Sequence, residues 1–210
     1  MTVANFDKIL PLVTFETQFG TLSVFRPDAR TAEQTNLVAK DIFVEAFSSN
    51  YQHYYVQSGT DERIVQWLNL PNGTSILEWL GSTFDEEYAQ SLTGEKKFIY
   101  LCASDGTLVG WLSHSPVSEA GELYLSQCSL SQNFRNQKIA KKTFEEILSK
   151  GHMSTLFPGV KEVKLIARRI NTIASKLYEG AGFTKDETID PSIYGAGYTD
   201  RYVGFRKQIV

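Results

Sequence analysis

The sequence predicts a mixed α/β fold in which antiparallel hairpins come first and a βαβ unit follows, around one sheet. Residues 97–103 and 107–113 are apolar, strand-like runs that Asp105-Gly106, a strong hairpin turn, separates. Between about residues 122 and 183, strand and helix patterns alternate, which indicates parallel pairing through a helical crossover. No repeat, linker or low-complexity tract divides the 210 residues, so we expect a single domain over 1–210.

The first half of the chain begins with a strand over about residues 21–26, which Pro27-Asp28 ends ahead of a helix at about 31–47. Residues 48–96 are predicted as a helical insertion of short helices, which Pro71-Asn72-Gly73 and Gly81 separate. The hairpin of residues 97–113 then leads to a third strand, 122–130.

The second half is predicted to contain a helix at about 136–150, a strand at 162–168, a helix at about 172–180 and a strand from Phe183. Residues 202–210 are predicted to form a closing strand.

Composition excludes several classes of protein. Lys and Arg number 21 against 24 Asp and Glu, a net charge of −3, so no general attraction to nucleic acid or anionic membranes is expected. The sequence has neither a long apolar run for a membrane span nor a recognisable leader. Cys102 and Cys128 lack the spacing of a disulfide framework or a zinc site. We therefore expect reduced cysteines, no metal and a cytoplasmic location.

The junction between residues 122–130 and the following helix predicts an anion site. The strand feeds through Ser131 to Lys138 directly into a helix start, where unpaired backbone N–H groups and the positive end of the helix dipole coincide. A pyrophosphate would bind at such a point. The alternative is that Lys138, Lys141 and Lys142 form a solvated helix face and that the turn binds nothing.

A second motif runs from Asn171 to Phe183. Asn171 is predicted to cap the helix, with Ile173, Ala174 and Leu177 as its packing stripe. Gly182 supplies a left-handed or unhindered backbone position that returns the chain to a strand. These structural roles do not explain why residue 178 is a tyrosine.

These two segments resemble the GNAT-type N-acetyltransferases. Arg135, Lys138 and Ala140 occupy the positions of the family pattern Arg or Gln, two residues, Gly, one residue, Gly or Ala. Asn171, Ala174, the Leu177-Tyr178 pair and Gly182-Phe183 match every offset of the second pattern. The resemblance covers about residues 21–210 and implies a GNAT fold, a mixed, mostly antiparallel sheet of six or seven strands, flanked by helices and splayed at the CoA site.

One departure concerns the turn, because Asn136 and Lys138 stand where many family members have glycine. Helical φ angles would need no glycine there, and Lys138 brings a positive charge to a phosphate site.

The resemblance also implies the ligand and several roles. Acetyl-CoA would be the cosubstrate, and Tyr178 would protonate the departing thiolate. The backbone of the strand before the turn would pair with the pantetheine arm and polarise the thioester carbonyl. The implied acetyl-CoA contacts are Cys128, Leu130, Arg135, Asn136, Gln137, Lys138, Ile139, Ala140, Lys141 and Asn171.

The amine must lose a proton, and a carboxylate on residues 122–130 is the usual candidate for the base. Glu122 is the only one available. Period-two alternation would place it on one face with Tyr124, Ser126, Cys128 and Leu130, although members with a glutamate base have it nearer the position of Tyr124. His114 is an alternative base, and either residue could instead lie at the surface. Cys128 is interpreted as structural, since no His and Asp pair accompanies it.

The acceptor would be an amine of a small molecule or a protein, bound across the sheet from CoA by the first helices and the loop of residues 190–200. Tyrosines with Asp190, Asp200, Glu86 and Glu87 could receive a cationic amine or serve only packing and solvation. A monomer or homodimer is expected. The rival hypothesis is a catalytically inactive GNAT-like module that binds acyl-CoA or a protein partner.

Overall fold

The computed structural model describes residues 10–27, 32–56, 74–194 and 199–209. Its eight-stranded sheet has the order β1-β2-β3-β4-β5-β6-β8-β7. All neighbouring strands are antiparallel except β5 and β6, which run parallel. The strands are β1 (Val13–Thr17), β2 (Gly20–Phe25), β3 (Lys97–Ala103), β4 (Leu108–His114), β5 (Glu122–Leu130), β6 (Glu162–Arg168), β7 (Thr184–Asp186) and β8 (Tyr202–Gln208).

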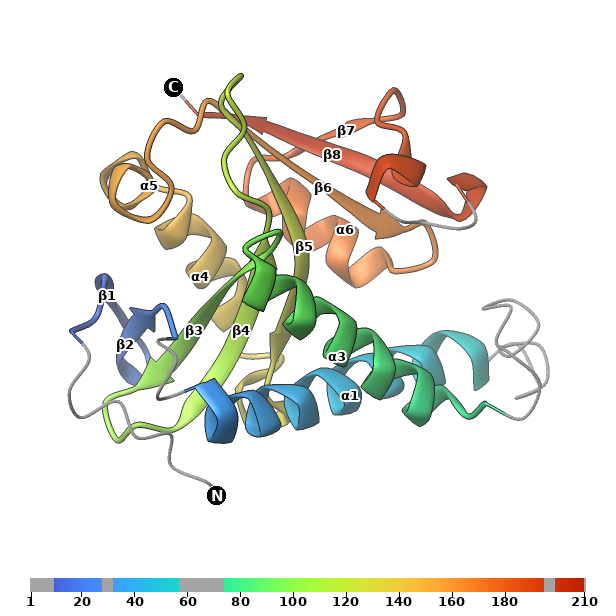
Figure 1. Ribbon diagram of the computed structural model, residues 1–210, viewed down its shortest axis with the longest axis horizontal. Coiled ribbons are helices and arrows are strands. Elements are labelled where there is room, and N and C mark those ends of the chain that lie inside the picture. The colour runs from blue at the N-terminus through green and yellow to red at the C-terminus, as the bar shows by residue number, and fades with distance from the viewer. Residues whose placement is uncertain (1–9, 28–31, 57–73, 195–198, 210) are drawn as a thin grey trace.

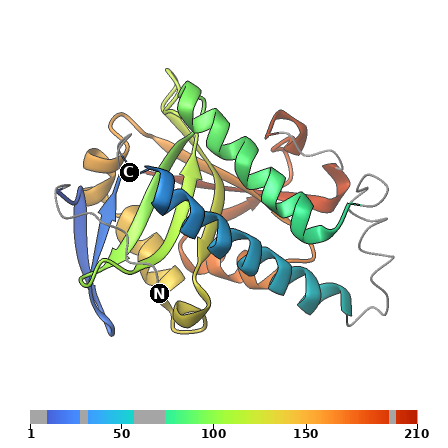
Figure 2. The ribbon, with the colours of Figure 1, turned by 60° about the horizontal axis from the view of Figure 1, so that its bottom comes forward.

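Helices cover both faces of the sheet (Figures 1 and 2). On one face lie α1 (Ala32–Val56) and α3 (Ile76–Thr93), over an aromatic core that includes Phe43, Phe84 and Trp111. On the other lie α4 (Ile139–Ile147), α5 (Lys150–Leu156) and α6 (Thr172–Gly180), over a larger aliphatic core. Short 3₁₀ turns at Gln132–Phe134, Pro191–Tyr194 and Thr199–Arg201 complete the described elements.

The predicted strands 97–103, 122–130 and 162–168 and the helix 172–180 agree with β3, β5, β6 and α6. The sheet has eight strands rather than six or seven, because β1 forms a hairpin with β2 that the sequence did not indicate. The predicted helix at 136–150 ends at Ile147, and α5 follows as a separate helix that Ser149 caps.

The predicted insertion of residues 48–96 is mostly helical in the part that the structure describes, but its division into short helices at Gly81 is wrong. α1 continues to Val56, and α3 runs unbroken through Gly81. A capping box of Ser75 and Glu78 starts α3, and Gly94 ends it in a left-handed conformation with φ +84°. A Cβ on Gly81 would lie 3.5 Å from Lys40 Cε of α1, an ordinary van der Waals contact, so this glycine lies within α3 beside α1 and does not end the helix. Pro71-Asn72-Gly73 lies outside the described residues.

Two irregularities occur in β5. Its parallel ladder with β6 joins Glu122–Leu125 to Glu162–Leu165 and extends no further in the described sheet, although β5 continues to Leu130 and β6 to Arg168. Its register with β4 shifts between Ser113 and His114, where Ser126 is the extra residue of a β-bulge. β5 and β6 therefore separate beyond Leu125. The bulge next to this point changes which way the following β5 side chains point.

In the described part of the chain, no helix has the length and apolar character that crossing a membrane requires.

Candidate active site

The gap between β5 and β6 exposes backbone groups of β5. The Ser131 N–H donates to the Val109 carbonyl at 2.9 Å, which fixes the hydrogen-bonded pairs of the antiparallel β4–β5 ladder at alternate residues. Ser129 and Gln127 therefore bond to β4, and the N–H and C=O groups of Cys128 and Leu130 point the other way. The β6 ladder ends at Leu125, so it does not reach these groups.

The predicted shared face of β5 is wrong, because the bulge at Ser126 shifts the alternation by one residue. Leu123 and Leu125 are buried in the core beneath α4 and α5, and beyond the bulge it is Cys128 and Leu130 that pack against the same core.

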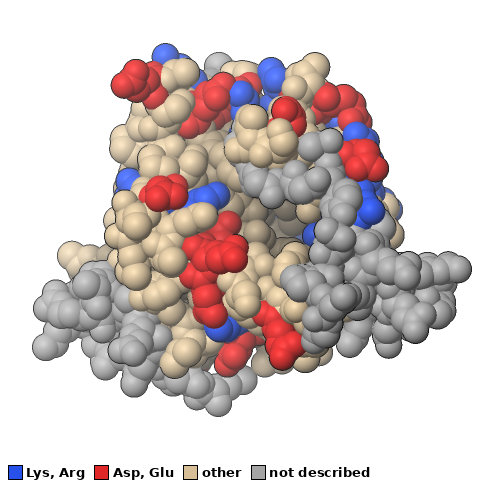
Figure 3. Space-filling model, turned by 45° about the vertical axis from the view of Figure 1, so that its right-hand side comes forward, with Lys and Arg blue, Asp and Glu red and all other residues tan. Residues whose placement is uncertain are grey.

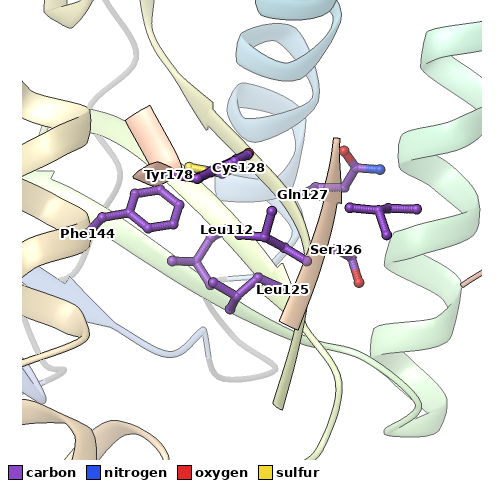
Figure 4. Close-up of a pocket in the computed structure, with 9 residues that line it drawn as sticks. Leu112, Leu125, Ser126, Gln127, Cys128, Phe144 and Tyr178 are labelled. Atoms are coloured by element: carbon purple, nitrogen blue, oxygen red, sulfur yellow. The ribbon is translucent and has the colours of Figure 1, made fainter. Parts of the chain in front are cut away.

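A pocket opens where β5 and β6 separate. It is lined by Leu112, Leu125, Ser126, Gln127, Cys128, Phe144, Leu165, Ile166 and Tyr178. Figure 4 shows Phe144 and Leu112 on one side, while the polar ends of Ser126 and Gln127 point away from them, towards α3. The pocket therefore has an apolar side under α4 and α6 and a polar side facing α3.

Tyr178 lies in this pocket with its ring held by other aromatic rings. The centroid distances from its ring are 5.6 Å to Phe144, 6.0 Å to Phe183 and 5.4 Å to Phe205. Burial raises the pKa of the Tyr178 hydroxyl above its usual value, so this group stays protonated at neutral pH. Burial likewise raises the pKa of the Cys128 thiol to about 12, which keeps it uncharged and opposes a nucleophilic role.

α6 positions Tyr178 through its two ends. The Asn171 side chain accepts a hydrogen bond from the Ala174 N–H at 3.0 Å, which confirms the predicted cap. Gly182 adopts φ +86°, the predicted left-handed conformation. Ile173 does not belong to the packing stripe, because it is 59% exposed while Ser175 is buried.

The turn before α4 has a left-handed backbone at two non-glycine residues. Asn136 has φ +60° and Lys138 has φ +59°, so the expectation of helical φ angles is wrong for these positions. Lys138 occupies the N-cap position of α4, and no side chain caps this helix end. The first N–H groups of α4 thus have no partner within the helix, as an anion-binding turn requires.

The Arg135 side chain forms hydrogen bonds with neighbouring groups of the protein. Its Nη1 and Nη2 donate to the two Glu45 carboxylate oxygens of α1 at 3.1 and 2.8 Å, and its Nε donates to the Leu130 carbonyl at 2.8 Å. This side chain therefore ties the turn to α1 and to the end of β5. No sequence pattern indicates its pairing with Glu45, which is 90 residues away.

Glu122 and His114 lie outside the set of residues that line the pocket. Glu122 stands at the start of β5, in the part still paired with β6, and its carboxylate is 2.5 Å from Lys164 Nζ. His114 is 2% exposed, and its Nδ1 lies 2.7 Å from the Ser115 carbonyl oxygen. Its ring meets Phe157 edge to face, at 4.9 Å between centroids.

The polar side of the pocket adjoins a cluster of interacting side chains that the sequence predicts only in part. The Glu87 carboxylate of α3 accepts a hydrogen bond from Ser113 Oγ at 2.7 Å and lies 3.9 Å from Lys96 Nζ. The same ammonium donates to Ser126 Oγ and lies 5.3 Å from the centre of the Tyr124 ring. Of the four predicted acceptor carboxylates, only Glu87 belongs to this cluster. Glu86 is exposed, and Asp190 accepts a hydrogen bond from the Ser192 N–H of its own loop.

Residues 62–183 match the model of the acetyltransferase (GNAT) family. No curated protein matches the chain by sequence.

Solved structures resemble the fold over most of its length. The PaiA N-acetyltransferase of Thermoplasma acidophilum, solved with coenzyme A, superposes with a TM-score of 0.54 at 18% identity, over 89% of this chain and 98% of that one. The spermidine N-acetyltransferase of Vibrio cholerae, solved with CoA and spermine, gives 0.56 at 10% identity, over 90% and 95%. The ribosomal-protein-S5-alanine acetyltransferase of Vibrio fischeri gives 0.53 at 12% identity, over 94% and 97%. At these identities the likeness concerns the fold alone.

Proposed function

We propose that this acyltransferase, which belongs to the GNAT acetyltransferase family, transfers an acetyl group from acetyl-CoA directly to a primary amine of a small molecule or a protein. One observation carries the proposal. Beyond Leu125, β5 leaves the β6 ladder, and the backbone groups of Cys128 and Leu130 turn towards the resulting gap beside Tyr178.

The residues around the gap fit acetyl-CoA. The free backbone groups of Cys128 would pair with the amide groups of the pantetheine arm, as a further strand would. The turn from Asn136 to Lys138 and the uncapped N-terminus of α4, up to Lys141, would receive the pyrophosphate, with Lys138 adding positive charge. Arg135 acts differently from a direct phosphate ligand, because it holds the turn against α1 and occupies the Leu130 carbonyl.

In the proposed reaction, groups of this chain act on two atoms of the thioester, its carbonyl oxygen and its sulfur. Acetyl-CoA supplies the acetyl group on a thioester. A β5 backbone N–H polarises the thioester carbonyl, and the Tyr178 hydroxyl donates its proton to the sulfur as the carbon–sulfur bond breaks. The raised pKa of Tyr178 keeps this proton in place until the sulfur needs it.

The structure does not support Glu122 as the base. Its carboxylate binds Lys164 before the point where the strands separate. His114 is equally unsuited, since burial lowers its pKa to about 4 and it lies outside the pocket lining. Glu87 of α3, which Lys96 links to Ser126 of the pocket lining, is the better-placed carboxylate to accept the proton that the amine loses as it attacks the thioester.

The test measures acetyl-CoA binding and turnover separately. A thermal-shift titration should raise the unfolding midpoint, because a ligand at about 100 times its Kd adds roughly 2.7 kcal/mol to the folded state. Coupled CoA release with a panel of primary amines then reports turnover. Tyr178→Phe, which keeps the ring packing, should lower kcat by about 10² or more. Tyr88→Phe, outside the pocket lining, is the matched control.

Two outcomes would contradict the proposal. If acetyl-CoA did not bind, the proposed cosubstrate site would not exist. Binding without turnover on a broad amine panel would favour the rival, an inactive module that binds acyl-CoA.

A further inference from the structure

We infer that Glu87, Ser126 and Tyr124 form a binding site for the ammonium group of the acceptor, which Lys96 of the same chain fills in the resting protein. The inference rests on the proposed acetyl transfer and names its acceptor class, a primary amine at the end of an unbranched alkyl arm.

The surroundings of Lys96 Nζ contain three kinds of group that recognise an ammonium ion. The Glu87 carboxylate lies 3.9 Å away, Ser126 Oγ accepts a hydrogen bond, and the Tyr124 ring centre is 5.3 Å away. Together, the carboxylate neutralises the charge, the hydroxyl accepts a hydrogen bond from the ammonium, and the aromatic face attracts the ammonium by a cation–π interaction.

Burial makes this site selective for a cation. The side chains of Glu87 and Lys96 are only 13% and 18% exposed, so removing Lys96 without replacement would leave a largely buried carboxylate without a counter-ion. Ser113, which is fully buried, supplies one hydrogen bond to this carboxylate but no charge. Another cation can therefore take the place of Lys96 at lower cost than an uncharged group.

The site adjoins the place proposed for the acetyl group. Ser126 belongs both to this site and to the pocket that Tyr178 and Cys128 line. Figure 4 shows the ends of Ser126 and Gln127 pointing towards α3, away from Phe144. An amine held here would approach the pocket from its α3 side, while Tyr178 lines the side beneath α4 and α6.

Lys96 can leave without rearrangement of the fold. It lies between the end of α3 at Thr93 and the start of β3 at Lys97, and only its flexible side chain needs to rotate. Its linear arm also indicates the shape that the site accepts. On the side of the molecule that Figure 3 presents, acidic side chains gather beside a hollow, which favours the approach of cations.

The experiment compares steady-state kinetics for n-butylamine, which reproduces the lysine side chain, and its branched isomer tert-butylamine. Wild type should prefer n-butylamine. Glu87→Gln should raise the KM for n-butylamine about tenfold or more, because the negative charge that pairs with the ammonium is lost, and leave the KM for acetyl-CoA unchanged. Glu86→Gln, the exposed neighbour on α3, should change neither constant.

Lys96→Ala provides the opposite perturbation, since it vacates the site. The KM for n-butylamine should fall several-fold, whereas Lys97→Ala, at the exposed next residue, should have no effect. An unchanged amine KM in both Glu87→Gln and Lys96→Ala would overturn the inference. Should Glu87→Gln fail to fold, Lys96→Ala alone decides.

Failure of the proposed function would look different. Without any turnover, thermal shifts still test the ammonium site: n-butylamine should stabilise Lys96→Ala more than it stabilises wild type. Equal shifts in the two proteins would overturn the inference independently of acetyl transfer.

Discussion

Acidification should destabilise this protein through one buried histidine. His114 is 2% exposed, and burial lowers its pKa from the ordinary 6.5 to about 4. The folded state therefore disfavours a proton that the unfolded chain accepts readily. Stability is fully retained above pH 6.5, falls as the pH drops from 6.5 towards 4, and falls no further from this source at lower pH.

The size of the effect follows from the two pKa values. One pKa unit corresponds to about 1.4 kcal/mol, and pH 5 lies about 1.5 units below the pKa of the unfolded histidine, so His114 should lower the free energy of unfolding by about 2 kcal/mol between pH 7 and pH 5. Urea unfolding at a series of pH values measures this loss. Carboxylates titrate mainly at lower pH and affect wild type and variants alike.

The control is His114→Asn, whose amide can keep the hydrogen bond to the Ser115 carbonyl that Nδ1 makes. This variant is less stable at pH 7, because it loses the ring contact with Phe157, but it should lack the extra loss of about 2 kcal/mol on acidification. Parallel pH profiles for the two proteins would refute the reasoning, since the buried ring would then not control the acid response.

Two further predictions concern the turn before α4. Arg135→Met should lower the free energy of unfolding by about 1 kcal/mol, because the partly exposed, bidentate pair with Glu45 is lost. Adding Glu45→Gln to this variant should lower it little further. Urea unfolding of the two single variants and the double variant measures this, and additive losses would contradict the pairing. Lys138→Gly should raise stability by about 1 kcal/mol, because glycine tolerates φ +59° without strain. Lys138→Ala should bring no such gain in a thermal melt, and equal melting temperatures for the two variants would contradict the strain.

Local sequence signals predicted the core strands and α6 well. The apolar runs of β3, β5 and β6 and the cap and terminator of α6 are encoded by residues close in sequence, such as Asn171 and Gly182. Gly81 was misread because a glycine in a helix looks the same whether it ends the helix or continues it. α3 continues through Gly81 with Leu80 and Phe84 buried in the core, and this burial depends on tertiary packing.

The site was predictable where its groups belong to a local sequence motif, as the turn residues and Tyr178 do. Cys128, Leu130 and the turn residues follow one another along the chain, so the strand-to-helix pattern predicted them as one group. The bulge at Ser126 arises from the way β5 pairs with β4, and no residue pattern within β5 predicts it. The meeting of Glu87 with Lys96 depends on how α3 lies against the sheet, although the two residues are near in sequence.

The most direct measurement is residue-resolved amide hydrogen exchange of β5 with and without saturating acetyl-CoA. The Cys128 N–H faces the gap and should exchange much more slowly once the ligand pairs with it, whereas the Ser129 N–H, already in the β4 ladder, should change little. Unchanged exchange at Cys128 with acetyl-CoA bound would contradict the account, because the cosubstrate would then lie somewhere other than between β5 and β6.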